Sequence, residues 1–380
     1  MPASIYLDHN ATAPLLPEAL EALSRAAAEA WGNPSSLHAQ GREARKTMEE
    51  AREKIGALMG VPPAALVFTG GGTEACNLGF IGAAKANRDR GKHLVVSAIE
   101  HSAVRSAAIA LKKEGWELTW VKPNSEGLIE AASVAKALRP DTVLCAVMAA
   151  NNEVGSIQPV REIGALLREG GVLFFCDAVQ ALGKIPLELS SWPVDLAAVA
   201  AHKIGGPKGV GALYVRKGVS IDPHVRGGSQ ERGLRGGTEN APGIAGFGAA
   251  AAAWLKYAEE DRIRLRGLRD ALEQSLVQRI PGIRVNAAGT ARVPNTLNVT
   301  FPGCRGDILV MALDMRGIAV SAGSACASGS VKPSEVLLAM GRGEEEAMSS
   351  LRFSFGSGNA SEEIPRVVEA VEAAYRGALA

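Results

Sequence analysis

The chain has 380 residues, long enough for two or three domains, and 47% of them are hydrophobic, enough for substantial cores. Lys plus Arg (41) and Asp plus Glu (40) nearly cancel, and this balance gives no reason to expect a direct nucleic-acid partner. The five cysteines form no CxxC pair, which argues against a disulfide framework or a structural metal site and favours a reducing compartment.

Two helical segments are predicted near the start of the chain. The first ten residues, MPASIYLDHN, lack the basic start and long apolar run of a signal peptide, so we expect a cytoplasmic protein. Residues 17–31 predict a helix with Pro17 in its first turn. Residues 42–60 predict a second helix that ends at Gly60, because glycine is favoured just beyond a helix C-terminus.

Seven short apolar runs come next, separated by Ala-rich amphipathic stretches. Strands that are apolar throughout and alternate with helices are typical of a mainly parallel sheet covered on both faces. The last two runs are separated by only ten residues, which is short for a helical crossover, so we expect the final strand to be antiparallel. The runs are 65–69, 94–99, 117–121, 143–148, 172–176, 194–200 and 211–215.

The character of the sequence changes after residue 250. Charged helical segments precede a strand-like run at 295–301 and a closing helix from residue 361. The most apolar run, 244–255, is too short and too rich in Ala and Gly to span a membrane. We predict an N-terminal segment, 1–15, that packs with the small domain, a large domain, 16–250, and a small α+β domain, 251–380.

Glycines and a threonine come directly after the first predicted strand. Ligands of open α/β sheets bind beyond the carboxyl ends of the strands, so residues at these ends are candidates for a site. The segment GGGTEACN places Thr73 at a helix start, which suits a phosphate held by backbone N–H groups. The alternative is a tight connection without a ligand, and the pattern is neither a P-loop nor the dinucleotide motif GxGxxG.

Three later strand ends carry titratable side chains. His101 comes after one strand, although a lone histidine is more often structural than catalytic. Asp177 closes a wholly apolar strand, where it is either a helix N-cap or the partner of a cationic ring nitrogen. Lys203 leaves a buried strand, where it is either solvated or an amine nucleophile of lowered pKa. A lysine, a buried acid, an imidazole and a phosphate nest at one sheet edge form the set that pyridoxal phosphate needs.

A series of motifs runs in order along nearly the whole chain: YLDHNATAP, GNPSSLHAQG, FTGGGTEACN, IEHSAV, NNEVGSIQP, DAVQALGK, AHKIGGPKGVGALYV, GGSQERGLRGGTEN, SAGSACASG and SSLRFSFG. With these motifs the chain resembles the cysteine desulfurases of the NifS/IscS type, within the class V aminotransferase family. The resemblance implies the type I pyridoxal-phosphate fold, an α/β architecture. In this fold, helices cover a mainly parallel seven-stranded sheet, and a smaller α+β domain is attached.

The resemblance also implies roles for individual residues. Lys203 matches the lysine that forms a Schiff base with pyridoxal 5′-phosphate, and His101 the histidine that stacks on its ring and assists proton transfer. Arg352 matches the arginine that binds the substrate carboxylate, with a structural salt bridge as the alternative. The other matched positions are Asp177 at the pyridinium nitrogen, Gln180 at the phenolic oxygen, Asn152 beside that oxygen and the substrate, Gly72, Thr73 and His202 at the phosphate, and Thr238 at the phosphate of the other subunit of a homodimer.

Cys326 matches the nucleophile that takes sulfur from L-cysteine and holds it as a persulfide. It lies among Ser, Gly and Ala only, so we expect a loosely anchored loop that carries the thiol between the cofactor and an acceptor. The remaining cysteines lack this context. Cys145 and Cys176 are expected in buried strands, Cys76 on a packed helix, and Cys304 in a surface loop.

The resemblance predicts a pyridoxal-phosphate-dependent L-cysteine desulfurase that releases L-alanine. Its sulfur acceptor is expected to be a protein, either an iron–sulfur scaffold or a tRNA-thiolating enzyme. The alternatives are an aminotransferase, a selenocysteine lyase and a non-catalytic partner in sulfur assembly. Two residues depart from the family pattern: Ala200, where a phosphate-binding serine is common, and Glu335, where an aromatic residue or histidine is common.

Overall fold

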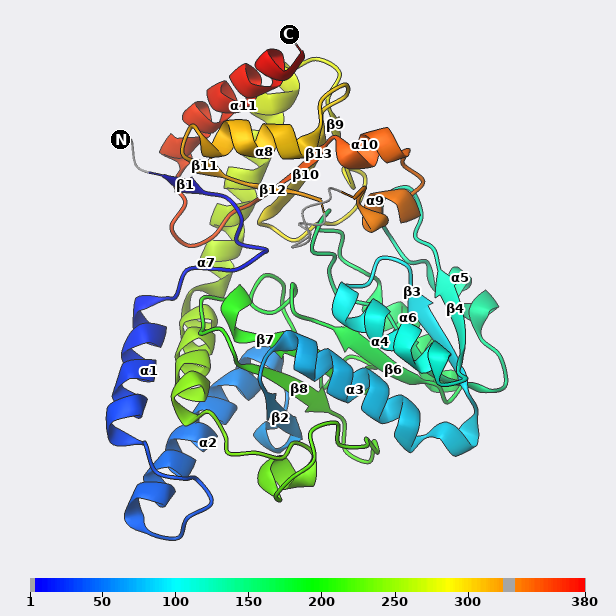
Figure 1. Ribbon diagram of the computed structural model, residues 1–380, viewed down its shortest axis with the longest axis vertical. Helices are drawn as coiled ribbons and strands as arrows, with labels where there is room; N and C mark the ends of the chain where they lie inside the picture. Colours follow the sequence, from blue (N-terminus) through cyan, green and yellow to red (C-terminus); the bar gives the residue numbers. More distant parts are fainter. Residues whose placement is uncertain (1–3, 324–331, 380) are drawn as a thin grey trace.

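The computed structural model describes residues 4–323 and 332–379. The largest sheet of the described residues has seven strands (Figure 1). The strand order is β2-β8-β7-β6-β5-β3-β4. Strands β3 to β7 pair in parallel, whereas β8 pairs antiparallel with β7 and β2, as predicted for the last strand. The strands are β2 Leu66–Thr69, β3 His93–Ser97, β4 Glu117–Val121, β5 Thr142–Ala146, β6 Leu173–Asp177, β7 Leu196–Ala200 and β8 Gly211–Val215.

Helices cover both faces of this sheet because successive apolar residues of each strand point to opposite sides. In β3, Leu94 and Val96 join the core beside α3 and α4, whereas Val95 joins the core beside α2, α5 and α6. As predicted, α1 begins at Pro17 and α2 is followed by Gly60, which has a φ of 63°. The helices are α1 Pro17–Glu29, α2 Ala39–Met59, α3 Gly72–Ala86, α4 Ser102–Lys113, α5 Ala131–Ala137 and α6 Val160–Glu169.

A second core surrounds the antiparallel sheet β12-β13-β10-β9. Leucine, valine and phenylalanine side chains of its strands pack there against α8, α11 and the end of α7. The N-terminal strand β1 pairs in parallel with β11 beside this core. The elements are β1 Ile5–Tyr6, β9 Arg284–Val285, β10 Thr296–Thr300, β11 Ile318–Ala319, β12 Ser321–Ala322, β13 Ser350–Ser354, α8 Gly306–Asp314 and α11 Ile364–Leu379. The short helices α9 Glu335–Ala339 and α10 Glu344–Met348 also follow β12, but their buried apolar residues join a core of the seven-stranded part.

One long helix, α7 (Ala241–Arg279), belongs to both parts of the molecule (Figure 1). Its buried alanine, isoleucine and phenylalanine side chains between 241 and 251 join a core of the seven-stranded part, and its buried leucines between 265 and 276 join the core of the four-stranded part. The boundary predicted between 250 and 251 therefore falls inside a continuous helix. Among the helices of the described ranges, none has the length and apolarity to cross a membrane.

The predicted surface position of Cys304 is wrong. This cysteine is only 4% exposed and belongs to the core of the four-stranded part. The turn after β10 folds under α11, where the hydroxyl of Tyr375 donates to the carbonyl of Pro302 at 2.7 Å. This turn contains polar residues, but its packing against a later helix buries the thiol. The other described cysteines, Cys76, Cys145 and Cys176, are buried as predicted.

Candidate functional site

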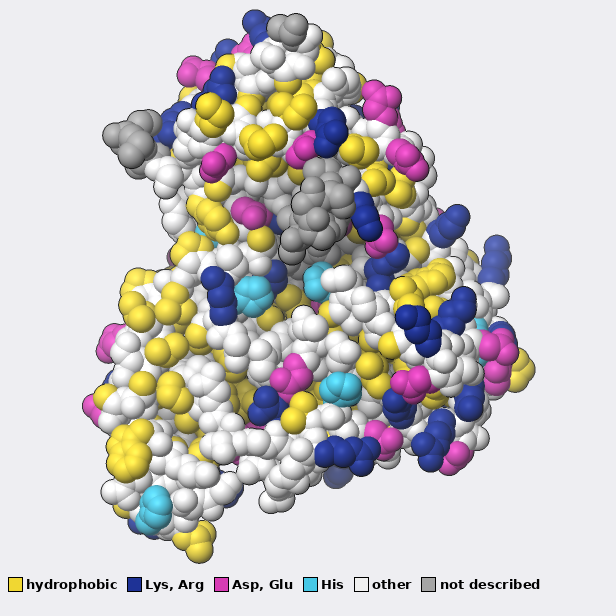
Figure 2. Space-filling model, viewed as in Figure 1, with side chains coloured by type: hydrophobic (Ala, Val, Ile, Leu, Met, Phe, Trp, Pro, Cys, Tyr) yellow, Lys and Arg dark blue, Asp and Glu magenta, His cyan; other side chains and the backbone are white. Residues whose placement is uncertain are grey.

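A cavity of about 660 Å³ lies where the carboxyl ends of the parallel strands meet the four-stranded part. On the face shown in Figure 2, histidine and basic side chains gather where the upper and lower parts of the molecule meet. Thr238 does not line this cavity, and Cys326 lies outside the described residues. The other predicted site residues all line it: Gly72, Thr73, His101, Asn152, Asp177, Gln180, His202, Lys203 and Arg352.

Asp177 places a buried carboxylate on the wall of the cavity. Its Oδ1 accepts the backbone N–H of Val179 at 2.9 Å, and its Oδ2 accepts the thiol of Cys76 at 3.8 Å. Burial raises the pKa of Asp177, and the neighbouring His101 and Lys203 oppose this rise. A buried carboxylate with so few donors is stabilised by a cationic group in the cavity.

Lys203 ends the short 3₁₀ turn Ala201–Lys203, which comes directly after β7. Its Nζ donates to the backbone carbonyls of Asn10 and Ala11, each at 2.7 Å. Burial and then the charge of Arg352 lower the pKa of Lys203 to about 8. Near neutral pH the amine is therefore unprotonated, and nucleophilic, more often than that of an exposed lysine.

Two histidines border the cavity. His101 precedes α4, and its Nδ1 accepts the N–H of Ala103 at 3.1 Å, so the neutral ring carries its proton on Nε2. His202 makes a hydrogen bond between Nδ1 and Oγ1 of Thr12 at 3.1 Å. Burial and then the charge of Lys203 lower the pKa of His202 to about 4. His202 is therefore a neutral hydrogen-bonding group at neutral pH.

The backbone at Gly72, the first residue of α3, packs closely against Val179 and Ala200, and we call this position the phosphate cradle. A Cβ at this position would lie 3.1 Å from Cγ2 of Val179 and 3.2 Å from Cβ of Ala200. Because α3 is 15 residues long, the free N–H groups and positive dipole of its first turn attract an anion at Gly72 and Thr73. Ala200, where the resemblance leads us to expect a phosphate-binding serine, lies beside this cradle and offers no hydroxyl donor.

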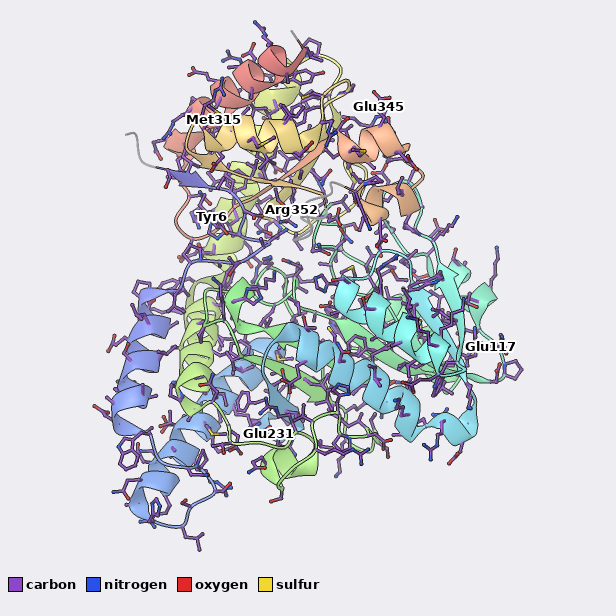
Figure 3. All side chains as sticks on the ribbon, in the orientation of Figure 1. Tyr6, Glu117, Glu231, Met315, Glu345 and Arg352 are labelled. Carbon is purple, nitrogen blue, oxygen red and sulfur yellow. The ribbon has the colours of Figure 1, made fainter. Side chains whose placement is uncertain are left out.

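Arg352, in β13, reaches the cavity from the four-stranded part, where Figure 3 labels it. Its Nη2 pairs with Oδ1 of Asp8 at 2.7 Å, and its Nη1 donates to the backbone carbonyl of Asn152 at 2.9 Å. Its Nε is buried and has no hydrogen-bond partner within the described ranges. The guanidinium thus makes the salt bridge considered as an alternative and still has an unused donor.

Lys184, which the sequence did not single out, lies behind the cavity wall in contact with Gln180. This buried lysine donates from Nζ to Oδ1 of Asn10 at 3.0 Å and to Oε1 of Gln180. The Nε2 of Gln180 donates to the Asn10 carbonyl at 2.9 Å, so its amide oxygen and one amide N–H are bonded to neighbouring residues. Burial, and then the charge of Lys203, holds the pKa of Lys184 well below its usual value. The available signal was a lysine between apolar residues in ALGKIPL.

Two further ionisable side chains that were not predicted for the site, Glu100 and Arg105, also line the cavity. Glu100 accepts the N–H of Met148 at 2.6 Å, and burial, then Asp177, raises the pKa of Glu100 to about 8. Arg105 of α4 pairs with Glu335 of α9 at 3.0 Å beside the cavity. Glu335, expected from the resemblance to depart from the common residue types, forms an ion pair here.

Comparisons with known proteins agree over nearly the whole length. The family model described as aminotransferase class-V matches residues 5–367. "Cysteine desulfurase IscS" of Methanosarcina thermophila is 42% identical over 368 residues, which cover 97% of this chain and 91% of that protein. A solved structure named "NIFS-LIKE PROTEIN" is 36% identical with a TM-score of 0.91, covering 97% of this chain and 98% of its own. "SspA in complex with cysteine" is 33% identical with a TM-score of 0.80, covering 93% and 99%.

Proposed function

We propose that Lys203, His101 and Cys326 carry out the reaction of this chain. The chain belongs to the class-V aminotransferase family and is a pyridoxal-phosphate-dependent cysteine desulfurase. Its fold is that of the NifS-like enzymes, as predicted. One observation supports the residue assignment above all others. The amine of Lys203, with its lowered pKa, and the buried carboxylate of Asp177 line the same cavity at the carboxyl edge of the sheet.

The residues of this cavity fit pyridoxal phosphate. Asp177 offers a buried negative charge to the ring nitrogen, and Lys203 offers an amine to the aldehyde carbon. The N–H groups at Gly72 and Thr73 suit the phosphate, with His202 as a further ligand. Gln180 and Asn152 would lie beside the phenolic oxygen. When bound, the cofactor serves as an electron sink for the bonds at the α-carbon of the amino acid.

The chain's own residues orient cysteine and transfer its sulfur. Arg352 would bind the substrate carboxylate with the donor that lacks a partner in the described ranges. His101 would move a proton through Nε2, because the N–H of Ala103 occupies Nδ1. The thiolate of Cys326 would attack the substrate sulfur, so that the carbon–sulfur bond breaks and a sulfur–sulfur bond forms. The carbon gains the proton that the thiol loses, giving one alanine and one persulfide per cysteine.

Two protein partners are part of the proposal. Thr238 is exposed and does not line the cavity of its own chain, which is consistent with a role at the cavity of a second copy in a homodimer. The persulfide on Cys326 would pass to an acceptor protein, either an iron–sulfur scaffold or a tRNA-thiolating enzyme. Identifying the protein that accepts radiolabelled sulfur from the persulfide would distinguish these two acceptors.

Replacement of the proposed nucleophile tests this function. The Cys326→Ser variant should bind cysteine, as seen by a change in the visible spectrum, but release alanine only at background rate. Cys304→Ser is the matched control, because that thiol is buried in a core away from the cavity, and it should retain alanine release. Normal turnover by Cys326→Ser would refute the persulfide route. Amino transfer to a keto acid would instead favour an aminotransferase, and release of selenium from selenocysteine would favour a lyase.

A further inference from the structure

Residues 226–240, here called the arm, lie beside strand β2 and carry Thr238. Figure 3 shows Glu231, which lies within the 3₁₀ turn η4 (Gln230–Gly233) of the arm, far below Arg352. Glu231 and Arg232 have positive φ angles of 44° and 60°. Two successive non-glycine residues in this conformation are strained and persist only where their surroundings hold them.

A buried ion pair holds this strained turn. Glu231 is 7% exposed. Its Oε1 accepts a hydrogen bond from Nη2 of Arg52 at 2.7 Å, and its Oε2 accepts one from Nη1 of Arg52 at 2.9 Å. Arg52, on α2, is also buried, and its guanidinium lies 4.2 Å from the ring centre of Phe68. A bidentate arginine–carboxylate pair of this kind fixes the orientation of the two side chains as well as the distance between them.

The same side chains pair with the free edge of the large sheet. Strand β2 ends the strand order, so among the described residues no strand pairs with its outer backbone groups. Oε2 of Glu231 accepts the N–H of Phe68 at 2.8 Å. The carbonyl of Leu66 accepts from Arg52 at 3.0 Å and from Arg232 at 2.7 Å. The arm is therefore in a fixed register with β2, held by side chains instead of a strand ladder.

A second ion pair holds the arm close to Thr238. Nε of Arg235 donates to Oε1 of Glu74 at 2.8 Å, and Oε2 of Glu74 accepts the N–H of Gly70 at 2.7 Å. Gly70 precedes the phosphate cradle at the start of α3. The N–H of Gly236 donates to the carbonyl of Val225 at 3.0 Å, which fixes the backbone two residues before Thr238.

We propose that the Arg52–Glu231 and Glu74–Arg235 ion pairs hold the arm so that Thr238 reaches the cofactor phosphate of the partner subunit. The proposal rests on the homodimer and the Thr238 role proposed above. Arg52 and Glu231 are then positioning residues for a site in the other chain. They line no part of the cavity in their own chain. A substitution of Arg52 or Glu231 in one chain should therefore weaken cofactor binding in the partner chain, that is, in trans.

Mixed dimers with one cofactor site test this directly. One chain carries Lys203→Ala, so covalent cofactor binding is confined to its partner, whose phosphate is served by the arm of the Lys203→Ala chain. Glu231→Gln is placed either in the Lys203→Ala chain (trans) or in the cofactor-binding chain (cis). The affinity for pyridoxal phosphate is measured by visible absorbance titration. We expect the dissociation constant to rise about tenfold in the trans arrangement, as for loss of a hydrogen bond to a charged group, and to stay near the native value in cis.

Three control variants, Thr238→Ala, Arg235→Met and Glu231→Asp, distinguish failure of the Thr238 role from failure of the positioning role. Thr238→Ala in trans should weaken binding by itself, and if it does not, the cross-subunit role of Thr238 fails irrespective of Glu231. If Thr238→Ala weakens binding in trans but Glu231→Gln acts equally in cis and trans, or not at all, the positioning role is refuted. Arg235→Met breaks the less buried pair and should weaken trans binding to a smaller degree, which keeps the test open if Glu231→Gln does not fold. Glu231→Asp should partly restore the trans affinity, since it keeps the charge.

Discussion

Two buried arginines occupy two regions of this molecule and differ in how completely their donors are used. Arg52 beside the arm is 4% exposed, and Arg352 in the cavity is 5% exposed. All three nitrogens of Arg52 donate, to Glu49, Glu231 and the Leu66 carbonyl. Arg352 donates from both Nη atoms, but its Nε has no partner within the described residues.

This difference separates a structural charge from one that can bind a ligand. A buried charge is tolerated when its hydrogen bonds are complete, and its removal then leaves the partner unpaired. A buried donor without a partner is costly unless a ligand supplies the acceptor. We therefore expect changes at Arg52 to affect the folding equilibrium, and changes at Arg352 to affect the reaction.

The largest effect is expected for Arg352→Leu. The value of kcat/KM for cysteine should fall about 1000-fold, equivalent to about 4 kcal/mol, as when one partner of a buried charge pair is truncated. The free energy of unfolding should change little, because the buried Nε without a partner is removed with the charge. Steady-state kinetics and urea unfolding measure the two quantities. Strong destabilisation with normal kinetics would instead support the structural salt bridge with Asp8.

A smaller effect, of the opposite kind, is expected for Arg52→Met. The free energy of unfolding should fall by about 3 kcal/mol, because Glu231 is left as a buried charge without its cation. At saturating pyridoxal phosphate, kcat should stay close to the native value. The double variant Arg52→Met/Glu231→Leu should recover part of the stability, since no buried charge is left unpaired. Equal destabilisation by the single and double variants would contradict this account.

The smallest effect is expected on the pH dependence of cofactor capture by Lys203. The unprotonated amine of Lys203 captures the cofactor, and its pKa is about 8 instead of the ordinary 10.5. The rate of cofactor capture by the apoprotein should therefore rise with pH and level off above about 8. The charge of Arg352 contributes to the lowering, so Arg352→Leu should move the midpoint upward, by less than about one pH unit. A midpoint near 10.5 in the native protein, measured by stopped-flow absorbance, would show that the amine is not desolvated.

Much of the site could be predicted because its residues come directly after the strands. Parallel strands bring their carboxyl ends to one edge, so Asp177, His101 and Lys203 line one cavity although they are far apart in the chain. Lys184 was missed because its partners, Asn10 and Gln180, come from separate segments. Its burial cannot be inferred from its immediate neighbours.

The sequence by itself determined the alternation of strands and helices, the antiparallel last strand and the polar residues at the strand ends. These features depend on local periodicity and connection length, which are written in neighbouring residues. Only the tertiary structure decided that α7 continues from one core into the other, that Cys304 is buried, and that Arg52 and Glu231 meet beside β2. Each of these depends on packing between distant segments, because burial and ion pairing are set by what a residue meets in space.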